Sequence, residues 1–255
     1  MNSALNPLPT VAILAGGLAT RLRPMTETAP KSLLEVNGEP FALHQLRLLQ
    51  SKGIRRVVFC VGHLGEMIQQ TIGNGSTLGL STPGLQVDYS FDGPALLGTA
   101  GAVRNALPKL GDSFFVMYGD SYLPCDYAAI ARQFQTAGLL GMMTVFRNEG
   151  KWDASNVEFE AGGVEGGKIV AYSKTNRTPR MHYIDYGLGV FRAEAFQGLP
   201  AGNACDLADV YADLLQRKQL RAFEVRERFY EIGSPAGLLE TAEFLAARGV
   251  SQAKS

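Results

Sequence analysis

The first half of the chain alternates short apolar runs with longer stretches in which apolar residues recur every three or four positions. The short runs predict strands, and the longer stretches predict helices that bury one face. The predicted strands are residues 11–14, 55–61, 86–90 and 113–117, and the predicted helices are residues 41–52, 64–71 and 99–107. Strands that alternate with helices indicate right-handed βαβ crossovers. The sequence therefore predicts an α/β fold with three α/β/α layers, built on a Rossmann-like, mixed but mostly parallel sheet.

The pattern changes after residue 138. Four strand-like segments follow without long helices between them, at residues 139–147, 155–160, 168–173 and 184–191, and the glycine-rich stretch 161–167 is typical of a hairpin turn. We expect these segments to form a mixed or antiparallel extension of the sheet. Helices are predicted at 206–218, with Asp206 as N-cap, and at 234–248, with Ser234 as N-cap and Pro235 at the first helical position.

No internal repeat or linker divides the sequence, so we expect a single domain over residues 1–255, with its core at about 10–247 and frayed residues from about 249 onward. A chain of 255 residues with 46% hydrophobic composition can bury the core of such a domain. The 24 basic residues balance the 24 acidic ones. This composition lacks the basic surplus typical of nucleic-acid-binding proteins and the acidic block typical of disordered tails.

Cysteine usage and hydropathy indicate where the protein works. The three cysteines form no C-x-x-C pair and are odd in number, which favours a reduced setting. Residues 1–9 lack the basic and apolar regions of a secretory leader, and 18 apolar residues nowhere run together. We therefore expect a soluble, cytoplasmic protein with no membrane partner.

The first predicted strand ends in a loop suited to phosphate. Gly16 and Gly17 follow the strand, and Arg21 and Lys31 lie a short distance beyond them. Glycines let backbone N–H groups approach a phosphate, while arginine and lysine are the side chains best suited to hold it. Paired glycines after a strand also often form a plain turn. Neither G-x-G-x-x-G nor G-x-x-x-x-G-K-[ST] is present, so the sequence has neither a dinucleotide fingerprint nor a Walker loop.

The ordered string G-G-x-x-T-R-L-x-P at residues 16–24, followed by P-K-S-L at 30–33, is more specific. It closely resembles the signature of the sugar-1-phosphate nucleotidyltransferases, also called nucleotide-sugar pyrophosphorylases, and looks nearest to their short bacterial single-domain branch. The resemblance implies that Arg21 and Lys31 are catalytic, with Arg21 on the departing β- and γ-phosphates and Lys31 on the α-phosphate and the incoming sugar phosphate. It also implies that the nucleotide contacts Leu14, Ala15, Gly16 and Gly17.

Two carboxylates are candidate metal ligands. Asp120 follows a hydrophobic strand, where an aspartate can bind Mg²⁺, although Gly-Asp pairs are also common in turns. In the family a G-D pair at this place resembles the metal site. Tyr118 departs from the Asn or Leu that many relatives carry before the glycine. Residues 229–235 resemble the family's second metal segment, W-x-D-x-G-T, with Glu231 at the acidic position; a solvated loop carboxylate is the alternative interpretation.

The remaining contacts are implied by weaker matches. Gly98 and Thr99 correspond to a segment that approaches the base and ribose, and a plain helix capped by Thr99 explains them nearly as well. Segments 155–158, 172–175 and 185–191 resemble the family's Y-G-V, E-K-P and N-A-G-I-Y-V-F segments. They supply the sugar-phosphate contacts Asn156, Lys174, Tyr186 and Gly187. Ser173 replaces the usual glutamate, so the acidic sugar contact is missing, and Tyr186 replaces a small residue and should reshape the sugar pocket.

The resemblance implies a Mg²⁺-dependent transfer of a nucleotidyl group from an NTP to a sugar 1-phosphate, giving an NDP-sugar and pyrophosphate. The attacking phosphate is already an anion, so no general base is required. One alternative is a cytidylyltransferase acting on phosphocholine or a similar alcohol, with an aromatic cage drawn from Trp152, Tyr172, Tyr183 and Tyr186. Another is a non-catalytic nucleotide-sugar-binding regulator, which would be expected to have lost Arg21, Lys31 or Asp120. The base, the sugar and the oligomeric state stay open.

Overall fold

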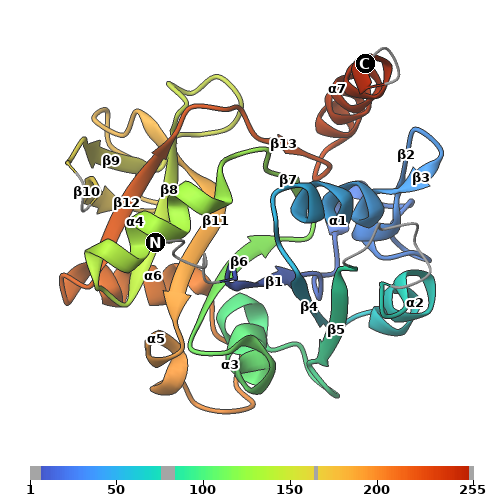
Figure 1. Ribbon diagram of the computed structural model, residues 1–255, viewed down its shortest axis with the longest axis horizontal. Coiled ribbons are helices and arrows are strands. Elements are labelled where there is room, and N and C mark those ends of the chain that lie inside the picture. Colours follow the sequence, from blue (N-terminus) through green and yellow to red (C-terminus); the bar gives the residue numbers. More distant parts are fainter. Residues whose placement is uncertain (1–6, 76–83, 164–165, 253–255) are drawn as a thin grey trace, which may run out of the picture.

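A nine-stranded sheet forms the centre of this computed structural model, which describes residues 7–75, 84–163 and 166–252 (Figure 1). Four parallel strands make up the half drawn on the right: β1 (Thr10–Leu14), β4 (Arg56–Val61), β5 (Gln86–Phe91) and β6 (Ser113–Tyr118). The four strands predicted for the first half of the chain are confirmed, and each bound differs from the prediction by at most one residue. Their carboxyl ends meet at one edge of the sheet.

The other half of the sheet is mostly antiparallel. Strand β11 (Tyr183–Arg192) runs antiparallel to β6 and joins the two halves. Around it lie β8 (Gly141–Arg147) and the antiparallel pair β9 (Val157–Glu160) and β10 (Lys168–Tyr172). The mixed extension predicted from the sequence is therefore confirmed. Residues 164–165 of the predicted hairpin turn lie outside the described residues.

Helices cover both faces of the sheet. One face packs against α3 (Gly98–Leu110), α5 (Glu194–Gln197) and α6 (Leu207–Gln216), which share one hydrophobic cluster with Ala12 and Val58 of the strands. The other face packs against α1 (Phe41–Ser51), α2 (Gly65–Ile72) and α4 (Tyr127–Ala137), which share a second cluster with Val11 and Ile13. Neighbouring strand residues point to opposite faces, so the all-apolar strand β1 serves both clusters. The three-layer α/β/α prediction is confirmed.

The sequence interpretation missed several elements. Helix α4 begins at the N-cap Asp126, whose side chain accepts a hydrogen bond from Ala129 N, and it buries Tyr127, Ile130 and Phe134. Strand β12 (Leu220–Val225) pairs in parallel with β8. Helix spacing was present in the sequence of α4, whereas the one-turn α5 is too short for a clear periodicity and the charged residues Arg221 and Glu224 interrupt the apolar run of β12.

The helix ends follow the predicted caps with one exception. Asp206 caps α6 by accepting from Ala208 N, and Ser234 Oγ accepts from Gly237 N at the start of α7 (Pro235–Gln252). Thr99 is not a cap, because α3 already begins at Gly98. Helix α7 continues four residues past the predicted end at 248. Of the residues expected to fray, 253–255 lie outside the described part of the chain.

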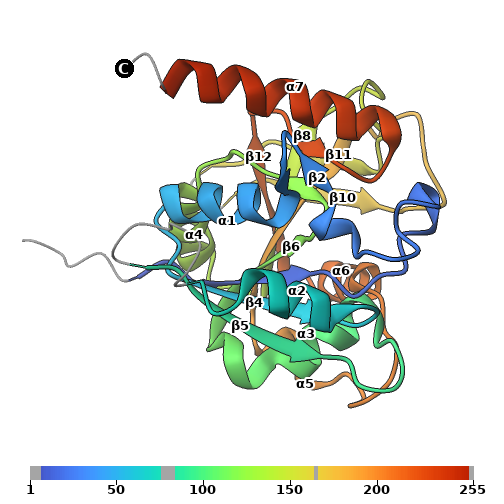
Figure 2. The same ribbon diagram turned by 90° about the vertical axis from the view of Figure 1, so that its right-hand side faces the viewer.

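Two small hairpin-like sheets lie beside the main one. Strand β7 (Ser121–Tyr122) pairs with β13 (Tyr230–Glu231), and β2 (Glu35–Val36) pairs with β3 (Glu39–Pro40). Both pack into a third hydrophobic cluster with α1 and α7, and α7 lies across the top of the molecule above α1 in Figure 2. In the described part of the chain, no helix is both long and apolar enough to cross a membrane.

Candidate active site

A cleft of about 260 Å³ opens at the carboxyl ends of the parallel strands. Its floor is formed where β1, β4 and β6 end. Gly16 lets two strand ends approach closely, because a Cβ at this position would lie 3.0 Å from Gly62 N. The cleft is lined by every residue predicted to bind nucleotide, namely Leu14, Ala15, Gly16, Gly17, Gly98 and Thr99, and also by Lys31 and Asp120.

The signature loop carries Arg21 and Lys31 on short 3₁₀ turns, η1 (Thr20–Leu22) and η2 (Lys31–Leu33). Ala19 adopts a left-handed conformation with φ of 48°, and Thr26 Oγ1 fixes the bend by donating to Ala19 O at 2.8 Å. Lys31 reaches the cleft. Arg21 is exposed on the loop and is not among the residues that line the cleft.

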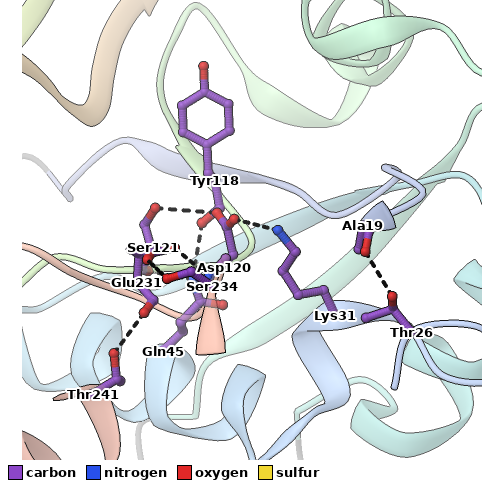
Figure 3. Close-up of polar contacts among 11 residues, drawn as sticks. Ala19, Thr26, Lys31, Gln45, Tyr118, Asp120, Ser121, Glu231, Ser234 and Thr241 are labelled. Atoms are coloured by element: carbon purple, nitrogen blue, oxygen red, sulfur yellow. Dashed lines mark hydrogen bonds and ion pairs between the residues drawn. The ribbon is translucent and has the colours of Figure 1, made fainter. Parts of the chain in front are cut away.

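Lys31 and Asp120 form an ion pair at the rim of the cleft, with Nζ and Oδ2 2.8 Å apart (Figure 3). The two side chains are 18% and 24% exposed, so solvent screens the pair only partly. Gly119 lets the end of β6 turn toward β1, since a Cβ there would lie 2.8 Å from Leu14 O. The pair thus places a cation and a carboxylate where the glycine loop ends.

Glu231, which is distant from Asp120 in the sequence, lies close to it in the structure. Pairing of β13 with β7 sets Glu231 beside Ser121, and Ile232 N donates to Asp120 O at 2.9 Å. A Cβ at Gly233 would lie 3.3 Å from Asp120 Oδ2 and closer still to Glu231 Oε2. The two carboxylates predicted to bind metal therefore converge beside Gly233, a position that only glycine can fill without displacing them.

The carboxylate of Glu231 is held by hydrogen bonds at the start of α7. Oε1 accepts from Ser234 Oγ at 2.9 Å, and Oε2 accepts from Gly233 N. These two bonds use part of the carboxylate's acceptor capacity and fix its direction. Thr241 Oγ1 in addition donates to the backbone carbonyl oxygen of Glu231 (Figure 3).

The donor set fits magnesium. Two carboxylates converge, and no cluster of three or more His, Cys, Asp or Glu side chains suited to a metal occurs among the described residues. Protein sites for Mg²⁺ usually supply one or two carboxylates and leave the other positions to water and substrate phosphates. A site completed by a bound triphosphate needs no third protein ligand.

Three of the predicted sugar-phosphate residues form a second group on the antiparallel half of the sheet. Asn156 Oδ1 accepts from Asp185 N at 2.9 Å, and Gly187 N donates to Asp185 Oδ1 at 3.0 Å. Lys174 Nζ lies 3.0 Å from Asp206 Oδ1. Both aspartates are functional candidates that the sequence interpretation missed, since it gave no role to Asp185 and only that of a helix cap to Asp206.

Asp206 links this group to the nucleotide side of the cleft. The same Oδ1 that pairs with Lys174 lies 3.4 Å from Thr99 Oγ1, and Thr99 Oγ1 accepts from Leu207 N. Burial alone would raise the pKa of Asp206, but the hydrogen bonds from Ala208 N and Lys174 outweigh it, so the pKa falls below the ordinary value. A charged Asp206 thus holds Lys174 beside the start of α3.

Asp185 is the carboxyl whose protonation the fold changes most clearly. Burial raises its pKa to about 6, against the opposing influence of Gly187 N–H and the Lys174 charge. Asp185 also acts on its neighbour Tyr118, because burial together with the charge of Asp185 raises the pKa of the Tyr118 phenol well above its ordinary value. Tyr118 and Asp185 therefore lie close enough to interact electrostatically.

Tyr186 does not lie on the sugar wall that the sequence predicts. It is 2% exposed, and its ring packs in the core against Phe146 and Phe229, with ring centroids 6.3 and 6.0 Å away. Successive residues of a strand point to opposite faces, and the neighbouring Asp185 instead accepts from Gly187 N and lies near the Lys174 charge. The bulky replacement of a small residue fills the core instead of the site.

The cleft also contains residues that motif matching missed. Asp92, at the end of β5, accepts from Leu97 N at 3.1 Å, and burial raises its pKa. Tyr118 closes β6 and lines the cleft, as does Cys60, whose thiol pKa burial raises to about 12. The available signal was positional: each of these residues lies at or within one residue of the carboxyl end of a parallel strand, where ligands of α/β sheets bind.

The fold is that of a three-layer α/β/α protein with a glycine-lined cleft at the carboxyl ends of its parallel strands. Residues 10–248 match the family model described as nucleotidyl transferase, and the chain belongs to that family. The family predicted from the sequence is thereby confirmed.

The chain is similar to curated relatives. It is 29% identical over 242 residues to N-acetylmuramate alpha-1-phosphate uridylyltransferase of Neisseria meningitidis, covering 89% of this chain and 94% of the relative. It is 26% identical to mannose-1-phosphate guanylyltransferase catalytic subunit beta of Xenopus tropicalis, covering 89% of this chain but only 62% of that relative.

Solved structures share the fold. The inositol-1-phosphate CTP transferase from T. maritima superposes with a TM-score of 0.73 at 18% identity, covering 94% of this chain and 96% of the other. HddC from Yersinia pseudotuberculosis superposes with a TM-score of 0.71 at 21% identity, covering 93% of this chain and all of the other.

Proposed function

We propose that this protein is an enzyme that joins an NTP and a sugar 1-phosphate to give an NDP-sugar and pyrophosphate. The observation that carries the proposal is the Lys31–Asp120 pair at the rim of the glycine-lined cleft, with the Glu231 carboxylate converging on the same point. The names of the two curated relatives support it, because both describe transfer of a nucleotide to a sugar 1-phosphate.

The reaction needs positioning and charge neutralisation more than acid–base chemistry. An oxygen of the sugar 1-phosphate attacks the α-phosphorus in line, the bond from that phosphorus to the bridging oxygen breaks, and the electron pair leaves with pyrophosphate. Lys31 binds the α-phosphate and the incoming phosphate, so its charge opposes the repulsion between the two anions. Arg21, exposed on its loop, binds the departing β- and γ-phosphates with its planar fork of donors.

Asp120 and Glu231 are the residues that would hold Mg²⁺. When bound, the ion neutralises phosphate charge in the same way as the lysine. Lys174, with its amine held by Asp206, binds the sugar phosphate, and Asn156 and Gly187 shape the wall beside it. The nucleotide lies along Leu14–Gly17 and against Gly98 and Thr99, whose backbones line the cleft.

Pyrophosphate release tests the proposal. Each NTP is incubated with a panel of sugar 1-phosphates and with phosphocholine, with and without EDTA. We expect one NTP–sugar pair to react, EDTA to stop the reaction, and Lys31→Ala to abolish it. Lys168→Ala is the matched control, because Lys168 is 68% exposed and pairs only loosely with Glu160 on the β9–β10 hairpin. Turnover of phosphocholine with CTP would instead identify a cytidylyltransferase, and nucleotide binding without pyrophosphate release would identify a regulator.

A further inference from the structure

Tyr118 departs from the family's sequence pattern and occupies the middle of the cleft. It ends β6, the strand that lies between β1 on the nucleotide side and β11 on the sugar side. Its ring carbon Cδ2 lies 3.6 Å from the position a Cβ would take at Gly187, so the ring packs on the backbone of β11. A side chain from the nucleotide half of the sheet thus reaches the sugar half.

The hydroxyl of Tyr118 has no hydrogen-bond partner among the residues that the structure describes. In Figure 3 it points away from the Lys31–Asp120 pair, and no contact ends on its oxygen. Three other tyrosines donate to protein oxygens: Tyr89 to Gly73 O, Tyr127 to Leu123 O and Tyr183 to Glu224 Oε1. The Tyr186 hydroxyl also lacks a partner among the described residues, but it is buried in the core and does not line the cleft. Because the phenol oxygen of a half-buried tyrosine normally finds a partner, a free one that lines a cleft is placed to receive a ligand.

The position and chemistry of the phenol select the ligand group. A tyrosine hydroxyl is a neutral donor at physiological pH. Tyr118 lines the cleft together with Lys31, and its phenol lies within electrostatic range of Asp120 and Asp206, the aspartates that pair with Lys31 and Lys174. An anion that contacts both lysines therefore comes near the phenol. A neutral donor at this point binds the anion without adding a third positive charge beside the aspartates.

We propose that the Tyr118 hydroxyl donates a hydrogen bond to the phosphate group of the sugar 1-phosphate, an inference that rests on the proposed function. Tyr118 is then a substrate-binding residue that this chain adds to the family's phosphate contacts. Because the acceptor phosphate carries its charge both before and during transfer, the bond stabilises the bound substrate and the transition state alike.

Tyr118→Phe tests the inference, since it removes one oxygen and leaves the ring in place. With the NTP–sugar pair found by the pyrophosphate assay, we expect KM for the sugar 1-phosphate to rise about 10-fold, as for loss of a hydrogen bond to a charged group. We expect KM for the NTP and kcat to stay within about twofold. Tyr183→Phe, which removes a hydroxyl bonded to Glu224 outside the cleft, is the matched control and should match the parent protein.

Three results would overturn the inference. An unchanged KM for the sugar 1-phosphate in an active Tyr118→Phe enzyme would show that the hydroxyl has no phosphate partner. A rise in KM for the NTP alone would place the hydroxyl on the nucleotide. If Tyr118→Phe matches the parent while Tyr118→Leu fails, the ring and not the hydroxyl matters. Absence of turnover by the parent with every pair would instead refute the proposed function, and the inference with it.

Discussion

Replacing Asp185 by asparagine should stabilise the protein, and more so at higher pH. The pKa of this carboxyl rises from the ordinary 3.8 to about 6 because burial disfavours the charged form. Between these values the folded chain binds more protons than the unfolded chain. The folded state therefore favours the protonated carboxyl. Its contribution to the free energy of unfolding is fully present below pH 3.8, declines as the pH rises through 6, and is absent above it. Asparagine does not titrate, and its Oδ1 can still accept from Gly187 N.

The magnitude follows from the two pKa values. The difference between the two pKa values means that Asp185 lowers the free energy of unfolding by about 3 kcal/mol at pH 8. At pH 5 the loss is about half as large, because the carboxyl is then mostly protonated in the folded state. The figure at pH 8 is an upper limit, because Asp185 is not fully buried. Relative to the parent, Asp185→Asn should thus gain roughly 1–1.5 kcal/mol between pH 5 and pH 8.

Urea unfolding of both proteins at pH 5 and pH 8, followed by far-ultraviolet circular dichroism, measures this difference. Asp126→Asn is the matched control, because it makes the same change at the exposed N-cap of α4, where asparagine caps about as well. We expect the control to differ from its parent by less than about 0.5 kcal/mol at either pH. A gain for Asp185→Asn that is equal at the two pH values, or a loss at pH 8, would refute the argument that a buried charge destabilises this site.

Three further predictions concern the proposed chemistry and the fold. Asp120→Ala should fold normally yet lose Mg²⁺-stimulated pyrophosphate release; wild-type turnover in a folded variant would remove Asp120 from the metal site. Lys31→Ala should lower kcat about 100-fold or more with a smaller change in the KM of the NTP. Arg21→Lys should also impair turnover, because the point charge of a lysine cannot reproduce the bidentate contact of an arginine. Steady-state kinetics check both, and an effect of Lys31→Ala on KM alone would contradict its catalytic role. Gly98→Ala should lower the melting temperature, since φ is +67° and a Cβ would lie 2.6 Å from Cys205 O; an unchanged melting temperature would contradict this.

Most of the fold could be predicted because its parallel half repeats a simple pattern. An apolar strand, a polar end and an amphipathic helix recur there. The glycine signature follows the first of these strands and indicates the end of the sheet at which the cleft opens. Strand β12 could not be predicted because Arg221 and Glu224 interrupt its apolar run, and the two-residue β13 holds no periodicity at all. The pairing of both strands is decided by distant parts of the chain.

The residues of the candidate site were likewise only partly predictable from the sequence. Motifs identified Lys31, Asp120 and Glu231, and the structure brings all three together. A motif gives the order of residues in a strand but not the face to which each side chain turns. The sequence therefore favoured Tyr186, which packs in the core beside Phe229, over its neighbour Asp185, whose charge acts on Tyr118. Asp206 was recognised only as a helix cap because its second partner, Lys174, is 32 residues away.

The pairing of β7 with β13 makes the convergent carboxylates depend on a contact between distant parts of the chain. Asp120 directly follows the parallel strand β6, whereas Glu231 lies in β13, more than a hundred residues later. The pairing joins only two residues of each strand, Tyr230 with Tyr122 and Glu231 with Ser121. A substitution that weakens this short pairing would therefore separate the two carboxylates while leaving the glycine loop and the Lys31–Asp120 pair in place.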